Sequence, residues 1–487
     1  MCGLVLRVER VSLVKVMFVE PPKDYWFVMG EYLPPPYGLL QLAGYLETKM
    51  PEVEIEVLDC QAMSLDWKGL EKRVGSFNPD VVATSGFATC NIYVAARTLE
   101  TAKKLKPDVL TVAGGQHFSS TAQESLEEYP EIDVIVRGEG EETLVELTKA
   151  LREKSSFSAI AGISFRNQYK IQHNPPRPLI NDLDSLPFPG YHFVKDYAHL
   201  YHFTMMAGSK ARYGMVEASR GCPHNCTFCS QWKHWQGSHR HKSVKRVADE
   251  IEFLYNNYGS RLLWLTDDNF GFGQRMENLC DELIGRGFSD DITCFMQARC
   301  DDVVRNQHLL AKMNRAGINW LLLGVESNSQ SNLNSFRKGT KPQDAVDAVQ
   351  LMKQNGIFSQ ATCIIGDHKD SHESIEELRQ FVNELDPDLA IFMILTPFPG
   401  TDLYEEAKLK GWIKNWNWAD YDMVHAIMPT ESLSREQLQH ELYKCYRSFF
   451  GSWSRRIEGF FSKNNVKRRV YRYMARQSVL SELKSLV

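Results

Sequence analysis

The sequence predicts an α/β protein that combines a parallel-sheet domain, a partial (β/α)6 barrel and a small, mostly helical C-terminal region. Short apolar runs alternate with amphipathic stretches of helix length in two separate parts of the chain, a pattern typical of parallel sheets covered by helices. A proline-rich stretch, NPPRPLINDLDSLPFPG, lies between these parts and indicates a linker. We therefore expect a first domain over 1–160, a linker over 161–205, a barrel over 206–405 and a helical region over 406–487.

The two parts differ in how their predicted strands follow one another. The first part is expected to be Rossmann-like, with the strands VKVMFVE, EIEVLD, DVVATSG, VLTVAGG and DVIVRGEG. The second contains six strand–helix units that begin with GMVEAS, RLLWLTDD, ITCFMQA, INWLLLGVES, FSQATCIIG and LAIFMILTP. Six such units predict a partial barrel of the TIM type, in which functional residues lie where the strands end.

Composition limits the class of protein. The 487 residues are 43% hydrophobic and carry a formal net charge of −5, which gives no support for nucleic-acid binding. Arg7, Glu9, Arg10 and Lys15 interrupt the apolar N-terminal stretch, so we expect neither a signal peptide nor a membrane span. Apart from one cluster, the eleven cysteines are scattered, as in a reducing compartment. We expect a cytoplasmic protein.

Three cysteines, Cys222, Cys226 and Cys229, form a C-x3-C-x2-C cluster directly after the first predicted barrel strand. Thiolates at this spacing can hold one face of a [4Fe–4S] cube and leave one iron with an exchangeable position. The alternative is a zinc knuckle completed by His224 or His234, although the second cysteine pair usual in zinc loops is missing. The cluster therefore favours an iron–sulfur site at the end of a barrel strand.

The cluster resembles the CxxxCxΦC signature of the radical S-adenosylmethionine (SAM) family, with Phe228 at the aromatic position. The resemblance covers roughly residues 210–405. It implies that the open iron binds the amino and carboxylate groups of SAM, and that an electron from an external donor cleaves SAM to methionine and a 5′-deoxyadenosyl radical. Polar residues at later strand ends would contact SAM, unless they only cap helices. These residues are Asp267, Asp268, Asn269, Gln297, Arg299, Glu326 and Ser327, and Phe228 of the cysteine motif is an eighth implied SAM contact.

The first domain resembles the cobalamin-binding Rossmann-like domain. Ser85-Gly86-Phe87 and Gly114-Gly115 fit its second and third motifs, but Leu39 and Gln41 replace the aspartate and the cobalt-ligating histidine of its first motif. The resemblance implies cobalamin bound without that histidine, with His117 as a tail or core contact. The implied contacts are Gln41, Ser85, Phe87, Thr89, Gly114, Gly115, Gln116, His117, Gly138 and Glu139. A plain Rossmann domain without cobalamin is the alternative.

The two domains together resemble cobalamin-dependent radical SAM methyltransferases. The resemblance implies transfer of a methyl group from SAM through methylcobalamin to an unactivated sp3 carbon. Size and the short first domain favour the branch that methylates the α-carbon of a glutamine in methyl-coenzyme M reductase, and hence a protein or peptide substrate. The alternatives are an anaerobic oxidative cyclase of a magnesium-porphyrin ester, a methylase of a small molecule and a non-catalytic cobalamin sensor.

Two further features stay open on the sequence alone. Trp232 and Trp235 closely follow the cysteine cluster, and could either wall a cavity between SAM and cobalamin or pack in the core. Residues 455–476 contain eight basic side chains and a single acid, Glu458. Such a run is either a solvated helix face or a docking surface for an acidic partner.

Overall fold

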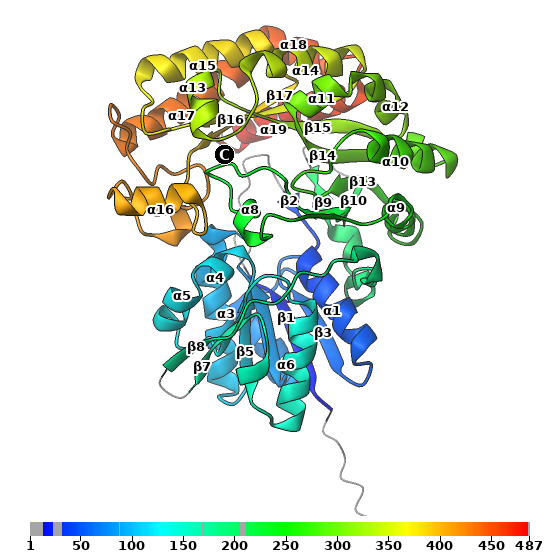
Figure 1. Ribbon diagram of the computed structural model, residues 1–487. Helices are drawn as coiled ribbons and strands as arrows, with labels where there is room; N and C mark the ends of the chain where they lie inside the picture. The colour runs from blue at the N-terminus through cyan, green and yellow to red at the C-terminus, as the bar shows by residue number, and fades with distance from the viewer. Residues whose placement is uncertain (1–12, 23–31, 87, 168–169, 205–210, 486–487) are drawn as a thin grey trace, which may run out of the picture.

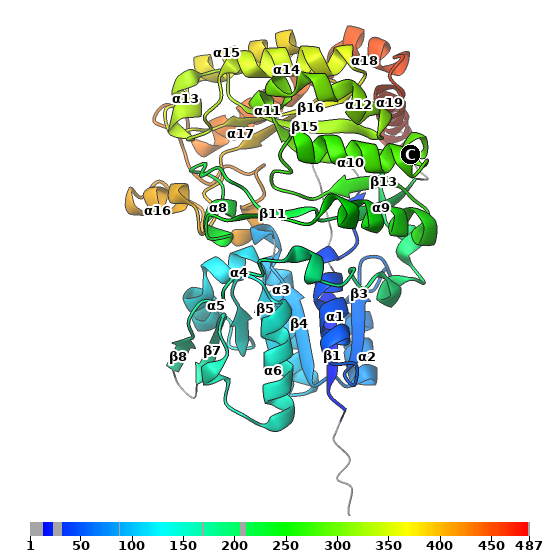
Figure 2. The ribbon, with the colours of Figure 1, turned by 45° about the vertical axis from the view of Figure 1, so that its right-hand side comes forward.

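The computed structural model describes residues 13–22, 32–86, 88–167, 170–204 and 211–485, and these residues form two lobes. The N-terminal lobe and the barrel lobe meet end to end, with helix α8 (Gln231–His234) between them in both ribbon views (Figures 1 and 2). The α/β fold class predicted from the alternation of strands and helices is confirmed in both lobes.

The N-terminal lobe is built on a seven-stranded sheet with the order β3-β1-β4-β5-β6-β7-β8, in which only the pairs that include β7 are antiparallel. Its strands are β1 (Lys15–Glu20), β3 (Glu54–Asp59), β4 (Val81–Ser85), β5 (Leu110–Gly114), β6 (Val134–Val136), β7 (Ile163–Asn167) and β8 (Lys170–His173). The last two strands lie inside the segment expected to be a linker. Its helices are α1 (Tyr37–Lys49), α2 (Trp67–Phe77), α3 (Ile92–Leu105), α4 (Gln116–Ser120), α5 (Ala122–Glu128) and α6 (Glu141–Glu153).

Alternation along β1 explains why both faces of this sheet are covered. Val16 and Phe18 pack in the core that includes α1 and α6, whereas Met17 and Val19 pack in the core that includes α2, α3 and α5. Successive side chains of a strand point to opposite faces, so an all-apolar strand requires helices on both sides. The strand order reverses between β1 and β4, and ligands of such sheets bind at the carboxyl ends of the strands near that point.

The barrel lobe contains six parallel strands in the order β10-β13-β14-β15-β16-β17. They are β10 (Arg212–Val216), β13 (Ser260–Leu265), β14 (Thr293–Arg299), β15 (Ile318–Glu326), β16 (Phe358–Ile365) and β17 (Leu389–Ile394). The connecting helices are α9 (Val244–Tyr258), α10 (Gln274–Gly285), α11 (Cys300–Arg305), α12 (Leu310–Arg315), α13 (Gln330–Ser335), α14 (Pro342–Gln354) and α15 (His372–Leu385). Each strand corresponds to one of the six predicted units, so the partial barrel is confirmed.

The C-terminal region contacts both lobes, because its last helix packs against the barrel strands whereas Trp418 meets His117 of the N-terminal lobe. It contains α16 (Asp402–Leu409), the 3-10 turn η8 (Trp418–Asp420), α17 (Arg435–Phe450), α18 (Trp453–Phe460) and α19 (Asn465–Ser485). Val470 and Tyr471 of α19 pack in one aromatic core with Trp320 of β15. Part of the basic run is used inside the fold, because Lys467 forms an ion pair with Asp388 and Arg455 forms one with Asp386.

The linker lies along α1 and brings the two lobes together. The backbone N–H of Gly190 donates to the Leu40 carbonyl at 2.9 Å. A Cβ on Gly44 of α1 would lie 3.0 Å from the Phe188 carbonyl oxygen, so the absence of a side chain at this position permits the close approach.

Candidate active site

The cysteine cluster lies on a loop that leaves a short hairpin of β11 (Ser219–Gly221) and β12 (His239–His241). Gly221, directly before Cys222, has φ +94°, and a Cβ there would lie 2.0 Å from the Ser238 carbonyl oxygen. Only glycine tolerates both the left-handed conformation and this approach. The residue before the first cysteine is therefore fixed by the backbone path that the loop must follow.

Backbone hydrogen bonds attach the cysteine loop to two other segments. Thr227 donates its N–H to the Phe336 carbonyl at 3.0 Å and accepts the N–H of Leu403 at 3.0 Å. The Cys226 thiol points to the Arg337 carbonyl at 4.0 Å. The loop between the first two barrel-lobe strands is thus held by the segment after α13 and by the start of α16.

The three thiols are half-buried, and burial raises the pKa of Cys229 to about 12. Within the described part of the chain, no three His, Cys, Asp or Glu side chains are arranged to share one metal ion. Three thiolates that bind different irons of a cube need not converge on one point.

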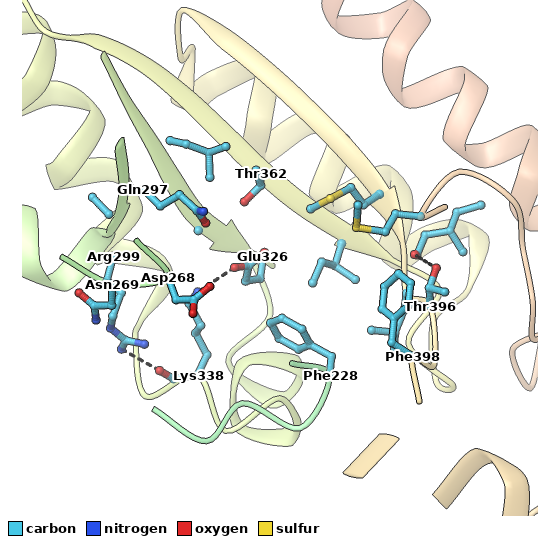
Figure 3. A pocket seen from close by; sticks show the side chains of 18 residues that line it. Phe228, Asp268, Asn269, Gln297, Arg299, Glu326, Lys338, Thr362, Thr396 and Phe398 are labelled. Carbon is cyan, nitrogen blue, oxygen red and sulfur yellow. Dashed lines mark hydrogen bonds and ion pairs between the residues drawn. The ribbon is translucent and has the colours of Figure 1, made fainter. Parts of the chain in front are cut away.

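A cavity of about 300 Å³ opens beside the cysteine loop at the carboxyl ends of the barrel strands. Figure 3 shows polar side chains around one end of it and Phe228 and Phe398 around the other. The wall contains six of the eight predicted SAM contacts. They are Phe228, Asp268, Asn269, Gln297, Arg299 and Glu326.

The polar end contains a buried ion pair that sequence reasoning missed. Lys338 Nζ lies 2.7 Å from Glu326 Oε1, and both side chains are less than a tenth exposed. Burial lowers the pKa of Lys338, but the charge of Glu326 and its hydrogen bond outweigh this effect and raise it overall. Lys338 therefore carries a positive charge in the cavity wall. In the sequence Lys338 stands in the stretch RKGT, which looks like an ordinary loop. It lies in the cavity wall because this loop packs against the cysteine loop in the folded protein.

Arg299 and Asp268 complete this end. Arg299 Nη2 donates to the Lys338 carbonyl at 2.7 Å and its Nε to Asp301 at 3.0 Å, which fixes the guanidinium plane. Burial raises the pKa of Asp268 to about 7, and the charge of Asp267 adds to this. Asp268 accepts a hydrogen bond from the Trp235 indole at 3.2 Å.

Two predicted SAM contacts lie outside the cavity wall and hold loops. Asp267 is 1% exposed and accepts hydrogen bonds from the Ala218 N–H, at 3.1 Å, and from the Ser219 hydroxyl. Ser327 accepts the Ser329 N–H at 3.1 Å. The first of these residues connects β13 to the start of the cysteine hairpin, which explains its burial.

The other end of the cavity is apolar, and its side chains come from the last two predicted barrel strands, from the turn after the sixth strand and from the C-terminal region. Its wall includes Ile364, Met393, Leu395, Phe398 and Met423. Met423 belongs to the C-terminal region. Its carbonyl accepts a hydrogen bond of 2.8 Å from the N–H of Ile394 in β17, which attaches this segment to the barrel.

Two non-glycine residues of the wall have positive φ angles. Glu326 has φ 62° and Met423 has φ 66°. Such conformations cost roughly 1–3 kcal/mol each and are concentrated at functional sites.

In the N-terminal lobe, the structure brings the predicted glycine and serine motifs together. Ser85 pairs with Gly114 across β4 and β5, and Gly86 N–H donates to the Gly114 carbonyl at 2.8 Å. Gly115 begins α4 with φ 92°. A Cβ on Gly138, at the end of β6, would meet no atom within 4 Å. Gly138 therefore presents its backbone to open space, whereas a Cβ on Gly86 would lie 2.6 Å from the Phe118 ring. Phe87 lies outside the described residues.

His117 of α4 is a buried contact in this lobe. It is 3% exposed, its Nδ1 lies 3.3 Å from the Thr89 hydroxyl, and its ring meets Trp418 of the C-terminal region edge to face at 5.0 Å. Burial lowers its pKa to about 4, so the imidazole is neutral near pH 7.

Glu139 and Gln41, two further expected cobalamin contacts, are engaged elsewhere. Glu139 accepts hydrogen bonds from Arg220 at 2.7 Å, from Arg240 at 2.9 Å and from the Ile180 N–H at 2.7 Å. Gln41 lies within α1, 2% exposed, and donates to the Pro187 carbonyl of the linker at 3.2 Å. Glu139 ties the lobes together, and Gln41 holds the linker.

The two tryptophans after the cluster occupy different environments. The Trp235 indole donates to Gln231 at 2.9 Å as well as to Asp268. The Trp232 ring lies against Gly237, where an added Cβ would be 3.0 Å from it. Neither side chain is part of the cavity wall, but Trp235 contacts a residue that is.

Comparison with known proteins identifies the family. The B12 binding domain matches residues 29–148 and the Radical SAM superfamily matches residues 216–382. An uncharacterised methyltransferase of Pyrococcus horikoshii is 31% identical over 90% of this chain and 93% of its own. The anaerobic magnesium-protoporphyrin IX monomethyl ester cyclase of Cereibacter sphaeroides is 32% identical over 85% of this chain and 67% of its own. The chain belongs to the radical SAM enzymes that carry a B12-binding domain.

Solved structures agree on the fold. The cobalamin-dependent radical enzyme OxsB, with aqua-cobalamin and SAM bound, has a TM-score of 0.75 at 19% identity over 97% of this chain and 72% of its own. The methyltransferase TsrM of Kitasatospora setae, with cobalamin and a [4Fe-4S] cluster bound, has a TM-score of 0.68 at 20% identity over 82% of this chain and 76% of its own. The matched domains and the two relatives confirm the radical SAM family predicted from the cysteine spacing.

Among the described residues, no helix has the length and apolar character needed to cross a membrane.

The residues present fit the cofactors of this family. Three thiols share one loop beside a cavity whose polar end offers both cationic and anionic side chains. Thiolates suit iron, and paired charges suit the zwitterionic amino-acid part of SAM. Gly138, after β6, offers backbone that a nucleotide tail can approach closely.

Proposed function

We propose that the enzyme is a methyltransferase that moves a methyl group from SAM to an unactivated sp3 carbon, with cobalamin as the carrier. The observation that carries this proposal is the two-ended cavity beside the cysteine loop, polar at Arg299 and Lys338 and apolar at Met393 and Phe398. When bound, the cluster and SAM supply a 5′-deoxyadenosyl radical and cobalamin supplies the methyl group.

The polar end has the groups needed to orient SAM. Arg299 keeps Nη1 free of the bonds that fix its plane, so it can donate to a carboxylate beside the charged Lys338. Asp268 and Glu326 are the acceptors for ammonium or hydroxyl groups at the same end. The apolar end then faces the substrate carbon, with water excluded by methionine and aromatic side chains.

Cavity size bears on how the substrate reaches SAM. About 300 Å³ lies at the low end of the roughly 300–1,000 Å³ typical of small-molecule sites. SAM alone would fill a cavity of this size, so the substrate must approach from outside it and the volume does not decide between substrates. A glutamine-containing protein segment stays our first candidate substrate.

The test is a parallel incubation under anaerobic conditions with SAM and a reductant. One arm contains a glutamine-containing peptide, one contains free tryptophan as a compact amino acid, and one contains a magnesium-porphyrin ester. We expect 5′-deoxyadenosine together with a product heavier by one methyl group, about 14 Da, in the peptide arm. A methylated amino acid with an unchanged peptide would move the substrate to a small molecule.

The second candidate function is cyclisation of a magnesium-porphyrin ester. The observation in its favour is the 30–32% identity to anaerobic cyclases of three organisms. Ring closure in the porphyrin arm, without methylation in the other arms, would establish this function and overturn the proposal.

We further propose that cobalamin binds without a histidine nitrogen on cobalt. Gln41 is held under the linker by Pro187, and His117 is enclosed by Thr89 and Trp418, so neither side chain is available as a ligand. The cob(II)alamin form should show no strong axial-nitrogen triplet in its paramagnetic resonance spectrum. A triplet that persists in wild-type protein and disappears in His117→Ala would contradict this.

A further inference from the structure

A chain of side-chain hydrogen bonds connects the N-terminal lobe to the cavity, and we call its four residues, Gln116, Gln231, Trp235 and Asp268, the Gln–Trp bridge. Gln116 Nε2 donates to Gln231 Oε1 at 2.8 Å. Trp235 Nε1 donates to the same oxygen at 2.9 Å and to Asp268 Oδ2 at 3.2 Å. A single amide oxygen therefore accepts one donor from each lobe.

The two ends of the bridge lie at the two proposed cofactor sites. Gln116 begins α4 directly after Gly115, at the carboxyl end of β5. Asp268 is part of the cavity wall. Gln231 follows Cys229 by two residues, so the bridge passes immediately behind the cysteine loop. In the ribbon views α8 lies between the two lobes, and the bridge crosses from one lobe to the other beside it (Figure 2).

Neighbouring contacts restrict the geometry of the bridge. The Ser230 hydroxyl donates to Gln116 Oε1 at 3.3 Å, which fixes the orientation of that amide. The guanidinium groups of Arg220 and Arg240 lie 5.9 Å and 5.5 Å from the centre of the Trp235 ring. A restrained network of this kind transmits a change at one member to the others, because its bonds share donors and acceptors.

We propose that the Gln–Trp bridge couples the two sites, so that cobalamin bound at the β5 edge increases the affinity of the cavity for SAM. This inference rests on the proposed function. A ligand at the β5 edge that contacts Gln116 stabilises the arrangement in which the Gln231 oxygen holds the Trp235 indole against Asp268. SAM that binds the same arrangement then binds more tightly. Thermodynamic linkage requires SAM to increase the affinity for cobalamin by the same factor.

Calorimetry of cluster-loaded protein without reductant tests the proposal, because SAM then binds without turnover. Its dissociation constant is measured with and without hydroxocobalamin. We expect cobalamin to tighten SAM binding by about tenfold in wild-type protein, within the range usual for coupled sites. Trp235→Phe retains the ring and loses the N–H donor, and Gln116→Ala removes the donor on the other lobe. In both variants the ratio of the two constants should fall to about one.

Trp232→Phe is the matched control, since it makes the same change three residues earlier on a ring that packs against Gly237. Its ratio should equal that of wild type. Iron and cobalamin contents are measured in every variant, so that a loss of coupling is read only between equally loaded proteins. The proposed coupling would be wrong if the dissociation constant of SAM in wild-type protein were the same with and without cobalamin. It would also be wrong if the ratio of these two constants were unchanged in both Trp235→Phe and Gln116→Ala. Failure of wild-type protein to bind SAM or cobalamin would instead overturn the proposed function.

Discussion

Replacement of Cys222, Cys226 and Cys229 together by alanine is expected to reduce the iron content of reconstituted protein from about four atoms per chain to none. The three thiols share one loop at the mouth of the cavity, and no other described cysteine lies on that loop. SAM cleavage should disappear with the cluster. Iron and sulfide analysis and the yield of 5′-deoxyadenosine measure the two effects.

Cys280→Ala provides the control. Cys280 is a fully buried thiol of α10, packed in the barrel core, so this change removes a thiol without touching the cluster loop. Iron content per folded chain should equal that of wild type. Normal iron content in the triple variant would show that the cluster lies elsewhere or is absent.

Much of the fold could be predicted because its signals are local. Each barrel strand is an apolar run bounded by a turn, and hydrophobic periodicity detects such runs. The cysteine motif is equally local, since all three ligands lie within eight residues. By contrast, β7 and β8 fell inside the expected linker because ISFRN and KIQH are short, mixed in polarity and antiparallel, unlike the strands before them.

The remainder of the site is built by contacts between residues far apart in the sequence, and hydrophobic periodicity does not predict such contacts. Lys338 enters the wall through a loop that also binds Cys226, and Met423 enters from beyond the barrel. Glu139 illustrates the opposite case. Its GEGEET context resembles a cofactor-binding stretch, but both of its oxygens are taken by arginines of the barrel lobe and by the linker.

Replacement of Arg220 by methionine should strongly destabilise the contact between the lobes. Its guanidinium is 5% exposed and bonds Glu139 at 2.7 Å, Glu141 at 2.6 Å and Glu217 at 2.9 Å. Arg240 would still neutralise Glu139, but Glu141 would remain buried without its partner. Loss of one member of a buried ion pair costs about 3–5 kcal/mol. Urea denaturation of cofactor-free protein should show this loss in the free energy of unfolding.

Arg286→Met is the matched control for this change. Arg286 also binds three carboxylates, those of Asp249, Glu252 and Glu282, but these are between 32% and 43% exposed. Exposed pairs contribute about 0–1 kcal/mol each, so the control should lose far less stability. Equal losses of unfolding free energy in the two variants would mean that burial of the carboxylates around Arg220 does not increase the contribution of its ion pairs to stability.

The pH dependence of the Arg220 effect gives an independent test. Burial raises the pKa of Glu141, but the charge and hydrogen bond of Arg220 outweigh burial and hold the pKa below its ordinary value of 4.5. A carboxylate whose pKa is depressed on folding stabilises the protein above its unfolded-state value, and this contribution is lost as the pH falls through the folded-state value. Without Arg220, burial raises the pKa of Glu141 in the variant. The difference in unfolding free energy between wild type and Arg220→Met should therefore be largest near neutral pH and shrink as the pH falls towards and then below 4.5. A difference that stays constant over this interval would show that lost packing, and not the unpaired charge of Glu141, causes the destabilisation.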